Sequence, residues 1–238
     1  MFSRIAAMLA LSCALAPYTL HAQDTEEARV KQSLQAKFPN IAVDTVKRMP
    51  FAGLFEVVMG SEVVYTDNKA EFMMGGTLYD IRSMPARNIT QDTTQKLVSK
   101  VLTSSHDSAI KMVRGNGRRV LYTFEDPNCG YCKQLYKELG KMTDVTVYTY
   151  LLPILSPDSA EKSRAIWCAR DRAKAWDQMM TKGVLTESSK PCDAPLAKNS
   201  EMAQRLNIRG TPAIYMASGQ QLGGFIPAPQ IEQALAKK

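Results

Sequence analysis

Long apolar runs, histidine and clustered basic residues are all scarce in this 238-residue chain, and each scarcity argues against a class of protein. No apolar run reaches the roughly 18 residues of a membrane-spanning helix. Only two histidines are present, and His21 lies in a segment that we expect to be removed, so a metal site is not favoured. The net charge is +7, but the basic residues are scattered among acids without interleaved aromatics, so we expect no nucleic-acid partner.

The first 22 residues have the pattern of a secretory signal peptide. Arg4 supplies the positive charge, residues 5–15 form a short apolar stretch, and Leu20-His21-Ala22 is a cleavage site before Gln23. Cys13 lacks the leucine expected three residues before a lipidated cysteine, so we do not expect lipidation. An exported chain that keeps four of the five cysteines is expected to contain disulfides.

The next segment, residues 23–87, predicts a small antiparallel sheet preceded by one helix. Residues 24–38 have a helical pattern, and short runs rich in Val, Tyr, Phe and Met follow between turn residues. The expected strands are residues 41–46, 54–59, 62–66 and 70–74. Such a sheet would be marginally stable alone, so we expect it to oligomerise or to pack on the rest of the chain.

Residues 88–106 predict a single connecting helix, and residues 107–238 predict an α/β unit. Pro85 ends the strand pattern, and residues 90–102 carry one apolar face. Beyond them, expected strands alternate with expected helices. The strands are residues 119–125, 145–151, 213–216 and a short run near 222, and the helices are residues 130–139, 158–180, 197–206 and 229–236.

The main chemical motif is Cys129-Gly130-Tyr131-Cys132, which follows an expected strand and opens an expected helix. A cysteine at a helix N-terminus lies among unpaired backbone N–H groups and the positive end of the helix dipole, which favour thiolate over thiol. A second thiol one turn along can attack a mixed disulfide formed on the first. The motif therefore indicates a redox dithiol.

The helical spacing after Cys129 assigns different positions to the two cysteines. Cys132, Leu135, Tyr136 and Leu139 fall on one inward face, whereas Cys129 is expected at an exposed helix start. This asymmetry suits a dithiol exchanger in which Cys129 attacks the substrate and Cys132 resolves the intermediate. A purely structural bridge and a four-cysteine zinc site are the alternatives, but the other two cysteines do not form a second C-x-x-C pair.

Two other features remain open from the residues alone. Cys168 and Cys192, if bridged, would close a loop worth roughly 3 kcal/mol, and we interpret them as structural, with a second redox pair as the alternative. The run Gly210-Thr211-Pro212 before an apolar strand suggests a cis proline, although only about one X–Pro bond in twenty is cis in folded proteins.

Several runs, taken together and in order, resemble the thioredoxin superfamily and, within it, the periplasmic disulfide isomerases of the DsbC/DsbG type. The resemblance extends over essentially the whole mature chain. The runs are residues 60–69 (GSEVVYTDNK), 78–80 (LYD), 129–132 (CGYC), 165–169 (AIWCA) and 210–213 (GTPA).

The resemblance implies an α+β protein with an N-terminal dimerisation domain, a linker helix and a C-terminal thioredoxin-like domain with a helical insertion. It implies that Cys129 is the nucleophile, Cys132 the resolving thiol and Thr211-Pro212 the cis-proline loop, with Cys168 and Cys192 as a structural disulfide. It also implies a periplasmic homodimer without cofactor or metal, which acts on misfolded disulfide-containing exported proteins and is kept reduced by a membrane electron donor of the DsbD type.

Three functions are compared on this basis. A disulfide isomerase is favoured because the sheet and linker precede the redox domain, and Gly-Tyr between the cysteines fits the isomerase branch. A thiol oxidase of the DsbA type would be favoured by a lone thioredoxin-like domain. A DsbG-like chaperone with secondary redox activity would use an adaptable apolar cleft, which the many methionines would suit.

Overall fold

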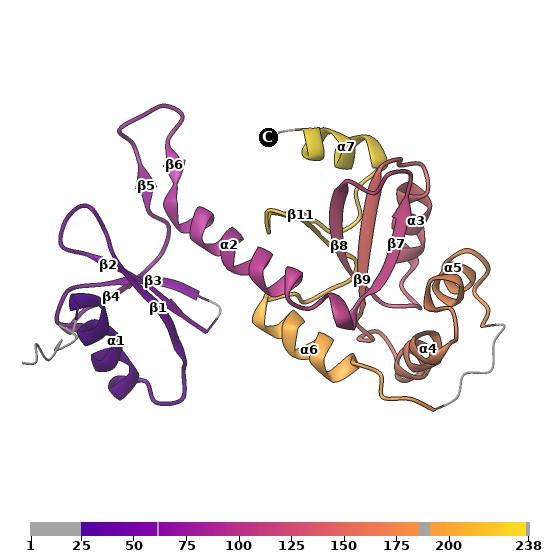
Figure 1. Ribbon diagram of the computed structural model, residues 1–238, viewed down its shortest axis with the longest axis horizontal. Coiled ribbons are helices and arrows are strands. Elements are labelled where there is room, and N and C mark those ends of the chain that lie inside the picture. The colour runs from indigo at the N-terminus through magenta and orange to yellow at the C-terminus, as the bar shows by residue number, and fades with distance from the viewer. Residues whose placement is uncertain (1–24, 61, 186–190, 237–238) are drawn as a thin grey trace, which may run out of the picture.

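The chain folds around two separate sheets joined by one helix, and this arrangement confirms the expected α+β class (Figure 1). The computed structural model describes residues 25–60, 62–185 and 191–236. The expected signal peptide, residues 1–22, lies outside these described residues. No helix in the described part of the chain is long and apolar enough to cross a membrane.

The N-terminal sheet is antiparallel and has the strand order β1-β2-β3-β4. Its elements are α1 (Glu26–Lys37), β1 (Val43–Arg48), β2 (Phe55–Met59), β3 (Glu62–Thr66) and β4 (Met73–Gly75). The fourth strand lies slightly later than the expected residues 70–74. A small hairpin of β5 (Tyr79–Asp80) and β6 (Arg87–Asn88) follows, which the sequence patterns did not predict.

One helix packs on each face of this sheet. Strand side chains alternate between the two faces, so neighbouring residues of one strand contact different helices. Helix α1 begins where Thr25 Oγ1 accepts a hydrogen bond from Ala28 N at 3.2 Å. Its Val30 and Leu34, one turn apart, pack with Val57 on one face. The next residue, Val58, points to the other face, where the connecting helix packs.

The connecting helix α2 (Ile89–Thr103) is hydrogen-bonded to both sheets. Near its start, Thr93 Oγ1 donates to Glu56 Oε1 of β2 at 2.9 Å. Near its end, Ser99 Oγ donates to the Ala217 carbonyl oxygen at 2.7 Å. The helix backbone passes so close to the C-terminal sheet that a Cβ at Gly219, whose φ is +85°, would lie 1.9 Å from the Gln95 carbonyl oxygen. Only glycine fits that contact.

The C-terminal sheet has the order β11-β10-β8-β9-β7, and β8 and β9 form its one parallel pair. A short 3₁₀ turn (His106–Ser108) leads into it. The strands are β7 (Ile110–Arg114), β8 (Arg119–Glu125), β9 (Val145–Leu151), β10 (Ala213–Met216) and β11 (Gln221–Gly223). The helices are α3 (Gly130–Leu139), α4 (Pro157–Cys168), α5 (Arg172–Lys182), α6 (Leu196–Arg205) and α7 (Ala228–Ala236).

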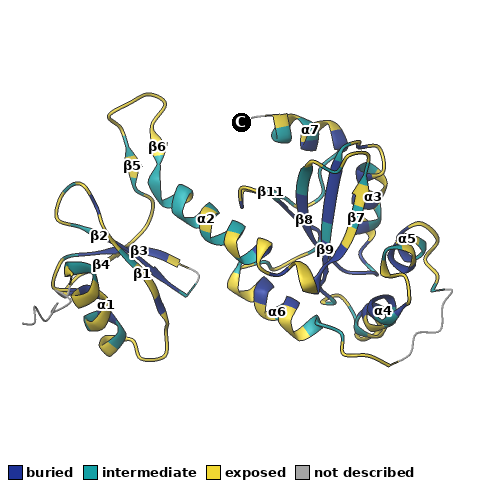
Figure 2. Ribbon diagram, in the orientation of Figure 1, coloured by how far each residue is buried: buried dark blue, intermediate teal, exposed yellow. Residues whose placement is uncertain are grey.

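Alternation along β8 divides the core into two layers. Leu121 faces α3 and α7, whereas Tyr122 and Phe124 face α6 and the end of α2. The central strands β8 and β9 are dark blue in Figure 2 because they are covered on both faces, while the β5–β6 hairpin is mostly exposed. The positions of β8 that face α3 are the ones that support the candidate site.

The expected helical stretch over residues 158–180 is two helices, α4 and α5. The chain is extended at Ala169, and Asp171 then caps α5 by accepting a hydrogen bond from Lys174 N at 3.0 Å. An aspartate three residues before a helical amide is a recognised start signal, so this break could have been predicted.

Candidate active site

Helix α3 begins at the first cysteine of the C-x-x-C motif. Cys129 is the N-cap residue, and its Sγ accepts a hydrogen bond from Cys132 N at 3.4 Å. The turn between β8 and α3 is held by a bond from Cys129 N to the Asp126 carbonyl oxygen at 3.0 Å. The Cys129 sulfur therefore lies at the start of α3, where it contacts a backbone amide of the first turn. Neither cysteine is disulfide-bonded in this structure.

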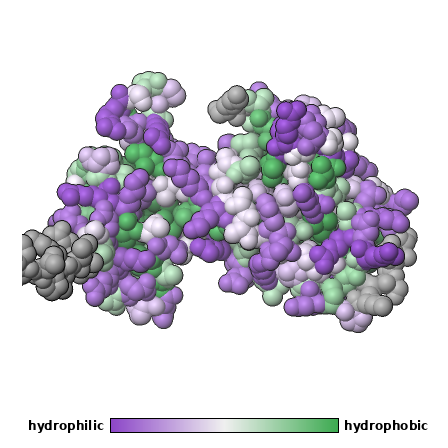
Figure 3. All heavy atoms as spheres, viewed as in Figure 1, coloured by the Kyte–Doolittle hydropathy of each residue, from purple (hydrophilic) through white to green (hydrophobic). Residues whose placement is uncertain are grey.

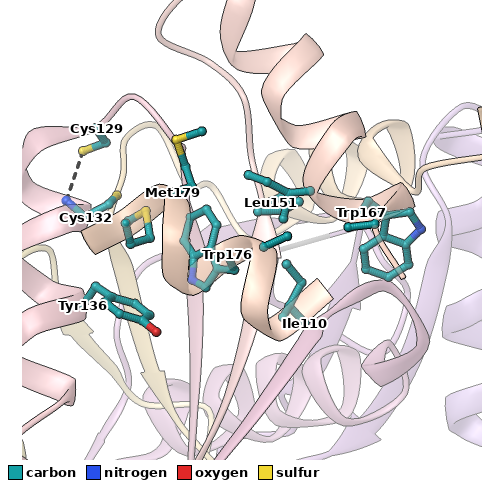
Figure 4. Packing of buried hydrophobic residues seen from close by; sticks show 12 residues of the cluster. Ile110, Cys129, Cys132, Tyr136, Leu151, Trp167, Trp176 and Met179 are labelled. Atoms are coloured by element: carbon teal, nitrogen blue, oxygen red, sulfur yellow. Dashed lines mark hydrogen bonds between the residues drawn. The ribbon is translucent and has the colours of Figure 1, made fainter. Parts of the chain in front are cut away.

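The second cysteine lies on the buried face of α3, as the spacing predicted. Cys132 has no exposed surface, and Leu135, Tyr136 and Leu139 are buried beside it. Figure 4 shows Cys132 and Tyr136 pointing from α3 toward Trp176 and Met179 of α5. Burial raises the pKa of the Cys132 thiol, and the nearby charge of Glu125 raises it further.

The prediction that Cys129 is exposed was wrong, since only 5% of its surface is accessible. The cover comes from the loop before β10, where the Cys129 thiol donates to the Thr211 carbonyl oxygen at 3.3 Å. The Thr211–Pro212 peptide bond is cis in the structure. Spacing within α3 could not reveal this contact, because Thr211 lies 82 residues along the chain.

An open pocket of about 510 Å³ lies beside the covered sulfur. It is lined by the loop of residues 207–213 and by residues from the β11 end, including Phe225. Tyr131, between the two cysteines, also lines it and is 62% exposed, with its ring 6.2 Å from that of Phe225. The pocket thus presents backbone groups and two aromatic rings, those of Tyr131 and Phe225.

A buried carboxylate holds the turn that carries Cys129. Asp126 is fully buried, and its Oδ1 accepts from Asn128 N and Ser159 Oγ, both at 2.8 Å. Its Oδ2 accepts from Ile154 N at 2.8 Å and Leu155 N at 3.0 Å. One side chain thus joins the dithiol turn, the loop after β9 and the first turn of α4.

A second buried carboxyl, that of Glu125, lies under α3 at the end of β8. Thr123 Oγ1 donates to Glu125 Oε1 at 2.7 Å, while Glu125 Oε2 has no hydrogen-bond partner in the described part of the chain. Burial raises the pKa of this carboxyl to about 7, and hydrogen bonds from Thr123 and Thr149 offset part of the rise. Sequence reasoning missed Glu125 and Asp126, although two consecutive acids at the end of an apolar strand and just before the dithiol were a usable signal.

The remaining cysteines form a disulfide at the edge of the helical region. Cys168, the last residue of α4, is bonded to Cys192 with a Cα–Cα distance of 5.6 Å. Among the residues that the structure describes, no group of three His, Cys, Asp or Glu side chains could hold a metal ion. The four cysteines in the described part of the chain are thus two separate pairs.

Comparisons with known proteins cover both parts of the chain. Residues 21–91 match the family model of the disulfide bond isomerase protein N-terminal domain, and residues 106–238 match that of a thioredoxin-like domain. The chain is 42% identical to the probable thiol:disulfide interchange protein DsbC of Bordetella parapertussis over 215 residues, which is 90% of this chain and 76% of the relative. It is 28% identical to the thiol:disulfide interchange protein DsbC of Escherichia coli strain K12 over 225 residues, 93% and 92% of the two chains.

A solved structure is similar to part of the chain. The crystal structure of a disulfide interchange protein from Neisseria gonorrhoeae superposes with a TM-score of 0.53 at 43% sequence identity. The match covers 56% of this chain and 96% of that one.

Proposed function

The chain belongs to the DsbC family of thiol:disulfide interchange proteins, and we propose that it rearranges wrong disulfides in exported proteins through the Cys129–Cys132 dithiol. The observation that carries this proposal is the asymmetry of the two sulfurs. Cys129 lies at the start of α3 beside an open pocket, and Cys132 is fully buried one turn along. The Cys129 sulfur can react with a protein substrate, and the Cys132 sulfur can then react with Cys129.

The reaction is a sequence of thiol–disulfide exchanges. The Cys129 thiolate attacks one sulfur of a substrate disulfide, the substrate S–S bond breaks, and a mixed disulfide forms as a substrate thiolate leaves. A different substrate thiolate then attacks the substrate sulfur of the mixed disulfide and expels Cys129 as a thiolate. The substrate has exchanged partners, and the protein is again a dithiol with no net transfer of electrons.

A second outcome is net reduction of the substrate. Cys132 loses its proton and attacks the Cys129 sulfur, which expels the substrate thiol and leaves a Cys129–Cys132 disulfide. Two electrons have then passed to the substrate, so a donor must return them. In an oxidising periplasm we propose a membrane electron donor of the DsbD type for this step.

The other site residues have supporting roles in this proposal. The Thr211–Pro212 loop covers the Cys129 sulfur and lines the pocket, so we assign it to substrate backbone binding. The Cys168–Cys192 bond closes a chain segment away from the dithiol and is assigned a structural role. No metal or organic cofactor takes part in any step.

We also propose that the protein is a homodimer joined through residues 23–87, with residues 88–106 as the linker and 107–238 as the catalytic domain. Large apolar side chains remain exposed on β4, just before it and on the β5–β6 hairpin, which supports a partner surface there. They are Phe72, Met73, Met74, Tyr79, Ile81 and Met84. Figure 3 shows apolar spheres near the tip of this hairpin. Strand β4 is also an edge strand of its sheet.

Refolding of a protein with scrambled disulfides tests the proposal. Cys129→Ser should abolish the activity, because no mixed disulfide can form. Cys132→Ser is the matched control: it should keep isomerisation while losing net reduction. Full activity of Cys129→Ser would overturn the mechanism. The thiol state in cells tests the direction, since a reduced dithiol supports an isomerase and an oxidised one supports a thiol oxidase.

A further inference from the structure

Among the described residues that line the pocket beside Cys129, Arg209 is the only charged one. The other lining residues are aromatic, aliphatic, hydroxyl or amide residues and glycines. The Arg209 side chain is exposed, and no carboxylate in the described part of the chain forms an ion pair with it. An uncompensated charge next to a nucleophile acts on any charged group that a substrate brings there. The exchange reaction itself gives this charge no role.

The loop that carries Arg209 is fixed to the end of helix α6. Ile208 N donates to the Ala203 carbonyl oxygen at 2.8 Å, and Asn207 N donates to the Gln204 carbonyl oxygen at 3.0 Å. Asn207 has a φ of +54°, a left-handed conformation that asparagine adopts more readily than most residues. Its Oδ1 accepts a hydrogen bond from Arg209 Nε at 3.0 Å, which orients the guanidinium. The charge is therefore held in place before a substrate arrives.

The position of Arg209 relative to the reactive sulfur follows from the chain. It lies two residues before Thr211, whose carbonyl oxygen accepts a hydrogen bond from the Cys129 thiol. Two residues span at most about 7 Å of extended chain, so the Arg209 backbone lies within about 7 Å of the Thr211 backbone. A substrate segment that pairs with this loop has its own residues at the same spacing. A substrate side chain about two residues from the reacting cysteine therefore comes opposite Arg209.

A neighbouring pocket contains charges of both signs. Arg209 also lines this pocket of about 380 Å³, together with Glu62 of β3 and Arg205 of α6. Arg205 Nη2 lies 3.8 Å from Asp44 Oδ2. Glu62 lines this second pocket and does not line the one beside Cys129. On the side of the dithiol, the charge that a substrate meets is thus the Arg209 guanidinium.

We propose that Arg209 selects substrates that carry an acidic residue about two positions from the cysteine that reacts with Cys129. The inference rests on the proposed function and names the class of protein segment with which the site reacts fastest. The guanidinium attracts a substrate carboxylate as the segment enters the pocket, and it repels a lysine or arginine at the same position. The exchange is unchanged: an S–S bond to Cys129 forms, the substrate S–S bond breaks, and a thiolate leaves with the electron pair.

Formation of the mixed disulfide with charged peptides tests the selection. Three five-residue peptides, blocked at both termini, have a central cysteine and carry aspartate, serine or lysine at both ends, so the charge lies two residues away in either direction. The peptide cysteine is activated as a thiopyridyl disulfide, so attack by the Cys129 thiolate on the peptide sulfur releases thiopyridone, which is measured by its absorbance.

The reduced full-length protein should react with the aspartate peptide about fivefold faster than with the lysine peptide in about 20 mM salt, with the serine peptide between them. In about 1 M salt, where the Debye length is about 3 Å, the three rates should converge. The ratio of the aspartate rate to the lysine rate within one variant removes any change in the reactivity of Cys129 itself.

Variants of Arg209 assign the preference to this side chain. Arg209→Glu should reverse the order, so that the lysine peptide reacts about fivefold faster, whereas Arg209→Lys keeps the charge and should keep the order. Arg118→Glu is the matched control, because it makes the same change in net charge at an exposed arginine. Arg118 directly precedes β8, whose seven residues extend about 23 Å toward the dithiol. Its ratio of rates should equal that of the unmodified chain.

Three results would overturn the inference. They are equal rates for the aspartate and lysine peptides with the unmodified chain at low salt, a ratio that Arg209→Glu leaves unchanged, and an equal change of the ratio in Arg118→Glu. If Arg209→Glu does not fold, Arg209→Gln takes its place and should bring the two rates within about twofold of each other; an unchanged ratio would again refute the selection. Failure to release thiopyridone from any of the peptides would instead overturn the proposed function.

Discussion

The Cys129 sulfur and the Thr211 carbonyl oxygen lie 3.3 Å apart, although 82 residues separate them in the sequence. Only 5% of the Cys129 surface is accessible, although the proposed reaction needs a substrate to reach its sulfur. A substrate must therefore meet Cys129 along the side that the pocket of Tyr131 and Phe225 leaves open. The direction of approach is set by a loop from the other end of the domain.

Alkylation of the reduced, folded protein should distinguish the two cysteines. Cys129 keeps a small accessible surface next to the pocket, whereas Cys132 has none and burial raises the pKa of its thiol. We expect iodoacetamide to modify Cys129 at least about tenfold faster than Cys132. Mass mapping of quenched samples measures both rates. Comparable rates in the folded protein would contradict the assigned roles.

Asp126→Asn should destabilise the fold and reduce isomerase activity together. The amide cannot accept all four hydrogen bonds that the carboxylate receives, so buried donors lose their partner. We expect a loss of about 3 kcal/mol in the free energy of unfolding, measured by urea titration. Asp158→Asn is the control, because that carboxyl is near the same loop but exposed. Equal stabilities of the two variants would show that the Asp126 bonds contribute little.

Glu125→Gln should stabilise the protein in a pH-dependent way. Burial raises the pKa of Glu125 from 4.5 to about 7, so the folded protein holds this proton more tightly than the unfolded chain. The carboxyl then lowers stability progressively as the pH rises from about 4.5 to about 7, by about 3 kcal/mol in full. The variant should gain that amount near pH 8 and little near pH 4 in urea titrations. Parallel stability curves for the two proteins would rule the effect out.

Removing the Cys168–Cys192 bond should lower stability without removing redox chemistry. The bond closes a segment with a sequence separation of 24, and the double substitution Cys168→Ala/Cys192→Ala should cost about 3 kcal/mol in the chain-entropy model. Mixed-disulfide formation at Cys129 should persist in the folded variant. In the unmodified chain, mild reductant should open Cys129–Cys132 before Cys168–Cys192. Mass mapping that finds the reverse order would refute the structural role.

Sedimentation of the full-length protein should show a dimer that depends on the hairpin. Ile81 and Met84 are 76% and 86% exposed, and replacing either by lysine should shift the protein toward monomer because a charge would enter the interface. Val113→Lys is the control, since Val113 is a 55% exposed apolar residue on β7 of the other domain. A monomeric unmodified protein, or an equal effect of the control, would exclude this interface.

Local patterns predicted most of the elements but not the contacts between distant segments. The strands over residues 119–125 and 145–151 and the helix over residues 130–139 were predicted with the bounds that they have in the structure. Strand β7 was not predicted, and in the structure it pairs with β9 rather than with β8, its neighbour in sequence. Strands β5 and β6 are two residues each and too short to show a period.

The candidate site shows the same division. The helical spacing of apolar residues alone placed Cys132 on a buried face, because that spacing depends on one helix and not on distant segments. The cover over Cys129 depends on the packing of the Thr211 loop, and no local pattern contains it. Glu125 and Asp126 were visible as acids in the sequence, but their importance follows from burial and bonding that only the folded chain defines.

Helix α2 sets the rotation of one sheet relative to the other, about the helix axis, as well as the distance between them. It is tied to Glu56 through Thr93 and to Ala217 through Ser99, six residues further along, which is a rise of about 9 Å. One residue inserted between these ties would lengthen the spacer by only about 1.5 Å but would turn one sheet about 100° around the other. In the proposed homodimer, the direction in which each dithiol points therefore depends on the number of residues in α2.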